Sequence, residues 1–271
     1  MKLVIILTLV TFTYADNRCQ GVYVDNRYYS LGIIKEGINN LHDLAMNQKD
    51  SALYFTFDDI STVTKTVSRV LGHLDMDTHK ATVIDGIRNA TAIAIDQINS
   101  RVYVGGSDGI FKINGMKAER LPIQDDIKAM HYKGVLYFVN ARREAYIFED
   151  GHARLVPELQ GIQVDSLVLD DDNNIFFTQN TKLFRIKLKT RAINTHENYL
   201  ANVLAVDKYR KVYIGTNKGL FVYNKYKYVF DKVAVFSNLK AITFNSVNEP
   251  IYAVADYIVK LNLNEVPCFE D

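Results

Sequence analysis

Residues 203–230 read VLAVDKYRKVYIGTNKGLFVYNKYKYVF and contain four short apolar segments separated by polar turns. The first segment is aliphatic, the second is centred on Tyr213, and the third and fourth contain Phe221 and Phe230. Short segments rich in Val, Ile, Tyr and Phe between turns with Gly and Asn are typical of antiparallel strands joined by hairpins. The stretch therefore predicts a unit of four β-strands.

The same pattern recurs along the whole chain. Each unit begins with an aliphatic segment, continues through a polar turn, and reaches a segment centred on Tyr or Phe, at positions 54, 103, 137, 176, 213 and 252. The aliphatic segments that begin the units are 43–46, 92–95, 129–132, 166–169, 203–206 and 241–244. Six four-stranded units of about forty residues are typical of a β-propeller. We predict an all-β, six-bladed β-propeller with the aliphatic strands innermost, around a central channel.

The sixth unit lacks its fourth strand, because the chain ends soon after Leu263. The segment 21–31, which precedes the first unit, has the Tyr and Val content of a strand but no unit of its own. Adding this segment to the last blade would remove an open sheet edge. We therefore expect the propeller to be closed by its N-terminal strand.

The first fifteen residues differ from the rest of the chain. Lys2 precedes a mostly apolar run from Leu3 to Phe12, and Ala15 is a small residue suited to cleavage. The run is shorter than the ~20 apolar residues of a membrane-spanning helix and fits a secretory signal peptide. We expect residues 1–15 to be a signal peptide and residues 16–271 to form a secreted, extracellular ligand-binding propeller domain.

The two cysteines of the chain lie near the ends of this domain. Two cysteines in an exported protein usually pair, and here Cys19 and Cys268 would tie the two termini together. Two free thiols are the alternative. A disulfide at these positions would lock the same join that the N-terminal strand makes.

The charge balance limits the partners of the protein. The 271 residues include 32 Lys and Arg and 31 Asp and Glu, so the chain lacks the basic field that nucleic-acid binding requires. No segment after the first fifteen residues is long and apolar enough to span a membrane. We expect a monomer without nucleic-acid or membrane partners.

Three motifs suggest chemistry but fit turns better. Residues 105–109 read GGSDG and match the GxSxG hydrolase motif, which requires a strand-to-helix turn, whereas strands flank it here. Residues 170–174 are DDDNN but lack the Gly and Glu that an EF-hand calcium loop requires at its sixth and twelfth positions. Residues 75–79 combine two Asp with a His between predicted strands. We expect no catalytic residue, metal or cofactor.

Asn89 begins the chain's N-glycosylation sequon, Asn89-Ala90-Thr91. In an exported protein this makes a glycoprotein plausible. The sequon lies next to a predicted innermost strand, where crowding would hinder modification.

Aligning the six units brings one polar position of each to the start of its innermost strand. In a propeller these positions would ring one mouth of the channel. Polar side chains at strand starts also occur simply because they meet solvent, but a few convergent polar groups above apolar walls are typical of a ligand pocket. We therefore predict a ligand-binding ring of His42, Thr91, Lys128, Asp165, Asn202 and Lys240.

The order and spacing of several segments resemble the ommochrome-binding proteins of Lepidoptera, the yellow chromoproteins of insect haemolymph. The matching segments are 19–22, 41–46, 52–55, 104–110, 156–159, 172–177 and 258–261. The resemblance covers nearly the whole secreted domain. It implies a haemolymph carrier that binds a tryptophan-derived phenoxazinone pigment and transports it without catalysis. It assigns no ligand residues.

Two alternatives remain open. Six-bladed lactonases of the gluconolactonase type hold a divalent cation with Glu, Asn and Asp at strand starts, and Asp165 and Asn202 occupy two comparable positions. The ring lacks a Glu, however, and a lysine ammonium cannot ligate a cation while it is charged. The other alternative is a propeller that binds proteins and has no small ligand.

Overall fold

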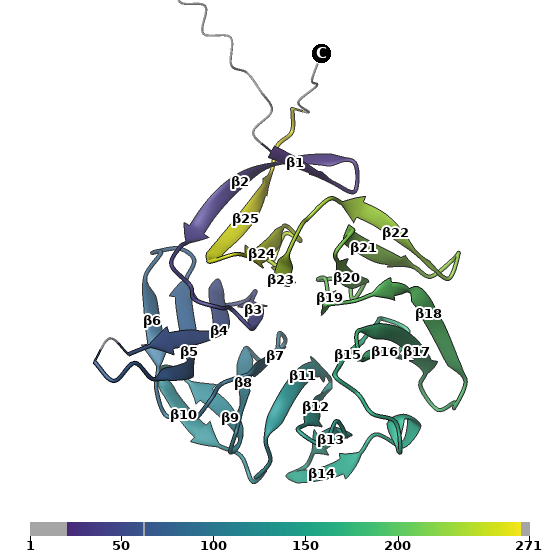
Figure 1. The fold of residues 1–271 in the computed structure, drawn as a ribbon, viewed down its shortest axis with the longest axis horizontal. Helices are drawn as coiled ribbons and strands as arrows, with labels where there is room; N and C mark the ends of the chain where they lie inside the picture. The colour runs from purple at the N-terminus through teal and green to yellow at the C-terminus, as the bar shows by residue number, and fades with distance from the viewer. Residues whose placement is uncertain (1–20, 62, 267–271) are drawn as a thin grey trace, which may run out of the picture.

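The computed structural model describes residues 21–61 and 63–266, which form six antiparallel sheets arranged as blades around a central axis (Figure 1). This arrangement confirms the predicted all-β, six-bladed propeller. The only helical element among the described residues is a 3-10 turn, η1 (Pro157–Leu159). No helix within these residues has the length and apolar character needed to cross a membrane.

In blades 1 to 5 the strands follow one another outward from the axis in chain order. The innermost strands are β3 (Asp43–Asn47), β7 (Ala92–Asp96), β11 (Ile127–Lys133), β15 (Ser166–Leu169), β19 (Val203–Val206) and β23 (Leu239–Phe244). The second strands are β4 (Ala52–Ile60), β8 (Arg101–Gly106), β12 (Val135–Asn140), β16 (Asn174–Gln179), β20 (Val212–Thr216) and β24 (Pro250–Val254). The third strands are β5 (Val67–Asp75), β9 (Gly109–Asn114), β13 (Ala145–Glu149), β17 (Lys182–Lys187), β21 (Gly219–Asn224) and β25 (Tyr257–Leu263). Blades 1 to 5 end in β6 (Ala81–Ile84), β10 (Lys117–Arg120), β14 (His152–Leu155), β18 (Ile193–Leu200) and β22 (Val229–Ala234).

The N-terminal segment belongs to blade 6. It forms a hairpin of β1 (Gly21–Val24) and β2 (Arg27–Lys35), and β2 pairs antiparallel with β25 from Tyr29 opposite Leu263 to Lys35 opposite Ile258. Asp25 and Asn26 at the hairpin tip both have positive φ, which suits a two-residue turn. The predicted signal peptide and both cysteines, Cys19 and Cys268, lie outside the described residues.

Adjacent blades pack face to face through apolar clusters. Between blades 4 and 5, the fully buried Phe176 lies 4.8 Å from the ring centroid of Tyr223, edge to face. Phe230 of the outer strand β22 adds a second ring against Tyr223 at 5.2 Å. Burying one such side chain contributes roughly 1.5–3 kcal/mol, so these faces hold neighbouring blades together.

A recurrent Asp or Asn closes the turn between the first and second strands. In blade 5, Asp207 Oδ1 accepts hydrogen bonds from the backbone N–H groups of Tyr209 (2.8 Å) and Lys211 (2.9 Å). In blade 6, Asn245 Oδ1 accepts from Val247 and Glu249 in the same manner. These buried polar side chains replace backbone hydrogen bonds that the turn lacks, which explains the polar residues found at this place in the repeats.

The GxSxG match is a hairpin between β8 and β9, as predicted. Gly105 lies on β8 opposite Ala92, and a Cβ added to it would lie 2.7 Å from Ile127 Cβ and 2.9 Å from Met130 Sδ. Gly215 on β20 makes a similarly close approach to the Leu239 side chain. These glycines therefore allow the first strand of the next blade to pack closely.

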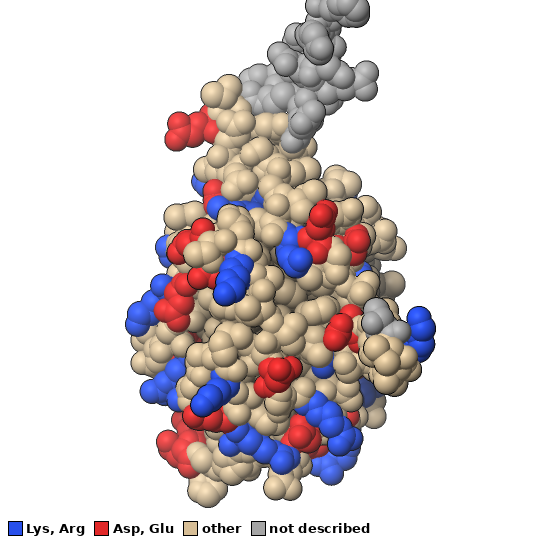
Figure 2. Space-filling view, turned by 90° about the vertical axis from the view of Figure 1, so that its left-hand side faces the viewer, with Lys and Arg blue, Asp and Glu red and all other residues tan. Residues whose placement is uncertain are grey.

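Charged side chains of both signs are interspersed on the face seen in Figure 2, with no broad patch of one sign. Several exposed charged side chains form ion pairs, such as Arg154 with Glu149 at 3.4 Å. Such exposed pairs contribute little to stability.

We expect Gly105→Ala to lower the free energy of unfolding by about 1–3 kcal/mol, because the added methyl group overlaps the buried Ile127 side chain. Urea denaturation followed by circular dichroism measures the change. Glu119→Ala, on the exposed outer strand β10 of the same blade, is the control and should change stability by less than about 0.5 kcal/mol. Equal stability of the Gly105→Ala variant and the wild type would contradict this packing argument.

Candidate functional site

The central channel consists of two adjoining cavities, one at each mouth. The cavity at the end where the innermost strands begin has a volume of about 170 Å³, and the cavity at the opposite end has about 220 Å³. We call these the strand-start mouth and the strand-end mouth. The two cavities share a waist of lining residues from five blades: Asp43, Met130, Val168, Leu204 and Ile242.

Five of the six predicted ring residues line the strand-start mouth, whereas Asp165 does not line this cavity. The five are His42, Thr91, Lys128, Asn202 and Lys240. His42 and Lys240, which are 198 positions apart in the chain, line the same mouth because the six blades are arranged around a common axis.

Three of these five side chains already have partners. His42 Nε2 lies 2.9 Å from Asp58 Oδ1, and Lys128 Nζ lies 2.7 Å from Asp126 Oδ2. The Thr91 hydroxyl donates a hydrogen bond to the backbone carbonyl of Ile127 in the next blade. These contacts hold the rim of the mouth in place. They also occupy hydrogen-bonding groups of the three side chains that would otherwise be available to a ligand.

Asp165 is directed toward blade 3. Its Oδ1 lies 2.7 Å from Arg143 Nε, and its Oδ2 accepts a hydrogen bond from the backbone N–H of Asn180. Within the described part of the chain, Lys240 and Asn202 have no side-chain partner. Lys240 is thus the ring cation that is free to contact a ligand.

The strand-end mouth contains a second set of polar groups that the repeat alignment did not single out. His131, Arg210 and Thr243 line it together with apolar residues such as Met46 and Phe244. His131 is 8% exposed, and its Nε2 has no hydrogen-bond partner. Burial, together with the nearby positive charges of Arg210 and Lys133, lowers the pKa of His131 to about 3, so the imidazole is neutral at physiological pH.

Asp43 lies at the waist and lines both cavities. Its carboxylate accepts hydrogen bonds from the backbone N–H groups of Leu44 (2.8 Å) and, in the next blade, Ile93 (2.7 Å). Burial raises the pKa of Asp43 to about 6, although both hydrogen bonds act in the opposite direction. Near neutral pH the channel therefore holds a carboxylate without a cationic partner among the described residues.

The repeats do contain a signal for these missed residues. Asp43 aligns with Ala92, Ala129, Ser166, Val203 and Ala241, and His131 and Thr243 align with Ala45, Ala94, Val168 and Ala205. A charged or polar residue in an otherwise small and apolar row is the deviation that marks the channel interior. Arg210 has no such signal, because turns are expected to be polar.

We expect the protonation of Asp43 to affect stability. Its pKa rises from 3.8 to about 6 on folding, so the folded state binds the proton more tightly than the unfolded chain does. The resulting stabilisation is complete below pH 4 and is lost as the pH rises through about 6. Relative to Asp43→Ala, the wild type should lose about 1–3 kcal/mol of unfolding free energy between pH 4 and 7, measured by urea denaturation. A difference that stays constant over this pH range would contradict the assignment.

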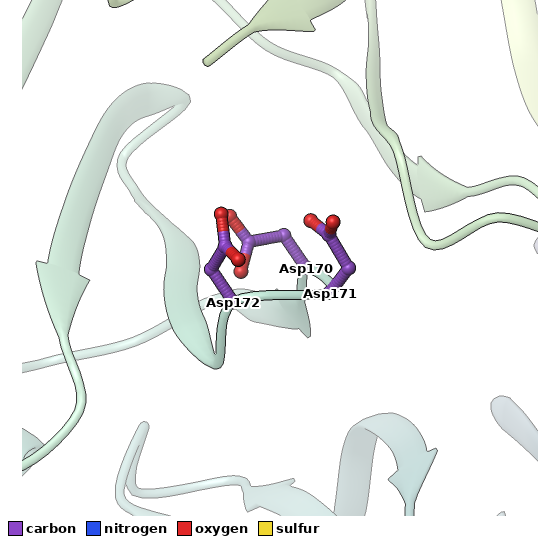
Figure 3. A group of neighbouring side chains, drawn as sticks. All are labelled: Asp170, Asp171 and Asp172. Carbon is purple, nitrogen blue, oxygen red and sulfur yellow. The ribbon is translucent and has the colours of Figure 1, made fainter. Parts of the chain in front are cut away.

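The acidic segment 170–172 is the group of possible metal ligands that the described residues contain (Figure 3). The three carboxylates rise from the turn between β15 and β16. Lys225 Nζ lies 2.7 Å from Asp171 and 3.4 Å from Asp172, and Lys133 donates to the backbone carbonyls of Asp170 and Asp171. Two ammonium groups therefore compensate the carboxylates, which is unfavourable for a cation at the same place.

The remaining sequence motifs form turns. Asp75 accepts hydrogen bonds from the backbone N–H groups of Asp77 and Thr78, which makes residues 75–79 a capped turn between β5 and β6. Asn89 is exposed in a turn before β7 with a positive φ of 49°. The crowding expected around Asn89 is therefore absent at its side chain, and the carboxamide is accessible.

Comparisons with known proteins agree with the resemblance found in the sequence. The chain is 24% identical over 248 residues to the ommochrome-binding protein of Manduca sexta. This match covers 89% of this chain and 90% of that protein. No protein-family model matches the chain.

Solved structures share the fold at low sequence identity. A gluconolactonase from Xanthomonas campestris superposes with a TM-score of 0.68 at 11% identity, over 91% of this chain and 96% of that chain. A streptogramin B lyase superposes with a TM-score of 0.55 at 12% identity, over 87% of this chain and 98% of that chain. At such low identity these similarities extend to the propeller fold alone.

Proposed function

We propose that the protein is a secreted, non-catalytic carrier that binds an ommochrome-type pigment in the central channel. The match to the ommochrome-binding protein over nearly the full length of both chains is the observation that carries this proposal. The channel supports it physically, because apolar walls with a few unpaired polar groups suit a planar aromatic ligand with polar substituents. The resemblance to haemolymph proteins suggests the extracellular fluid as its location.

Lys240 and Asn202 are the ring members proposed to contact the ligand directly. Both line the strand-start mouth and have no other side-chain partner among the described residues. Lys128, His42 and Thr91 would contribute after rearranging their present contacts, and Asp165 would do so only by leaving Arg143. We propose that the protein acts as a monomer without nucleic-acid or membrane partners and without a cofactor.

We expect the purified protein to shift the visible absorbance of xanthommatin on titration, with saturation at one pigment per chain. The double variant Lys128→Ala plus Lys240→Ala should bind with about tenfold lower affinity, because it removes a charge-assisted hydrogen bond to an anionic group. Arg154→Ala is the matched control, because Arg154 lies on the outer strand β14 and pairs with Glu149 of β13. Unchanged pigment affinity in the double variant would exclude the ring but leave the carrier function in place.

A calcium-dependent lactonase is the second candidate, favoured by the structural similarity to gluconolactonase. The arrangement at the strand-start mouth argues against it, because Asp165 is paired with Arg143 and Lys240 projects into the same mouth. Metal analysis and a lactone hydrolysis assay with added calcium separate the two. Bound calcium together with lactone turnover would overturn the carrier proposal.

We also propose that the pairing of β2 with β25 closes the ring and that a Cys19–Cys268 disulfide locks it. In protein secreted by insect cells, we expect mass spectrometry to find Asp16 as the first residue, a glycan on Asn89 and a linked peptide containing both cysteines. Reduction should lower the free energy of unfolding, by at most about 5 kcal/mol. Alkylation of both cysteines without prior reduction would contradict the disulfide.

A further inference from the structure

We propose that Arg210, together with the imidazole of His131, is a carboxylate-binding site at the strand-end mouth of the channel. The ligand class is a planar aromatic molecule that carries a carboxylate. The identification of that molecule as a pigment rests on the proposed function. The site itself rests on the four observations below.

The first observation is the path of the Arg210 side chain. Arg210 lies in the turn between β19 and β20 of blade 5, yet its Nη1 donates a 2.9 Å hydrogen bond to the backbone carbonyl of Tyr132 in blade 3. These two blades are separated by blade 4, so the side chain extends across part of the mouth. The guanidinium has five donors in a planar fork, and this hydrogen bond uses one of them.

The second observation is that this charge is uncompensated. Arg210 is partly buried, burial lowers its pKa, and no carboxylate within the described residues lies at ion-pair distance from it. The neighbouring cation Lys133 repels Arg210. Unlike Arg210, Lys133 lies beside acidic residues, and it donates hydrogen bonds to the backbone carbonyl groups of Asp170 and Asp171. A desolvated cation without a counter-ion is unfavourable, and an anionic ligand would supply the missing charge.

The third observation is the backbone at Arg210. Its φ is 63°, in the left-handed region, and the corresponding turn residues of blades 4 and 6 are Asn173 with φ of 61° and Asn248 with φ of 67°. Asn adopts this conformation more readily than Arg. The turn therefore does not require Arg, and the presence of Arg is explained by what its side chain does in the channel.

The fourth observation is the surroundings. His131 lines the same cavity and is more than nine-tenths buried. Its Nε2 atom has no hydrogen-bond partner. Apolar and aromatic side chains, among them Met46, Tyr132 and Phe244, form the walls. An aromatic ligand could place its carboxylate on the Arg210 guanidinium and its ring between these walls. The ligand would then satisfy the guanidinium donors and bury apolar surface at the same time.

The test compares indole-3-acetate with indole, which lacks the carboxymethyl group and therefore the carboxylate. Because the protein contains no Trp, excitation at wavelengths longer than the tyrosine absorption band produces fluorescence from the indole probe alone. The wild type should bind indole-3-acetate more tightly than indole. Arg210→Asn places in the turn the residue found at Asn173 and Asn248, so the variant should keep its melting temperature. The variant's affinity for indole-3-acetate should fall by about tenfold to a hundredfold relative to its affinity for indole, so that the preference for the carboxylate is lost.

Arg210→Lys keeps the charge but not the planar fork, and it should retain an intermediate preference. Arg191→Asn, an exposed arginine outside the channel, is the matched control and should bind both probes as the wild type does. The proposal is overturned if the wild type shows no preference for indole-3-acetate, or if Arg210→Asn, folded and thermally unchanged, keeps that preference.

A parallel titration with xanthommatin separates this inference from the proposed function. If indole-3-acetate binds through Arg210 but xanthommatin does not bind, the carboxylate site stands and the pigment function fails. If xanthommatin binds equally to the wild type and to Arg210→Asn, the pigment function stands and the identification of the Arg210 ligand with the pigment fails.

Discussion

The site depends on the packing of each blade against the next. Apolar faces such as that formed by Phe176, Tyr223 and Phe230 fix the angle between neighbouring blades, and six such angles together set the width of the channel. Close contacts at the inner strands, where Gly105 and Gly215 leave room for side chains of the following blade, complete this packing. Each lining residue thus owes its position to contacts made far from the channel.

The channel interior is less favourable for stability than a uniformly apolar one. Asp43, His131 and Arg210 each place a polar or charged group where the repeats otherwise have small or apolar residues or an easily accommodated Asn. Asp43 and Arg210 line the same cavity with charges of opposite sign. Unpaired groups of this kind are typical of binding sites, because a ligand restores the interactions that folding has removed.

The similarity to a gluconolactonase concerns the fold, whereas the match to an ommochrome-binding protein concerns the sequence. The fold follows from the number of blades and is shared by proteins with different activities. The proposed chemistry follows from the few residues at the mouths, where the positive charges of Lys240 and Arg210 are suited to an anionic ligand rather than to a metal cation. This difference is why the mouths, rather than the fold, support the carrier proposal.

The repeats by themselves determined the blade number, the innermost strands and the mouth at which His42, Thr91, Lys128, Asn202 and Lys240 meet. They did so because strand periodicity and turn chemistry are local properties that recur in each unit. Only the tertiary structure decided that Asp165 turns to Arg143 and that Arg210 reaches past a whole blade to Tyr132. Side-chain direction and charge pairing depend on neighbours from other blades, and no pattern within one repeat specifies them.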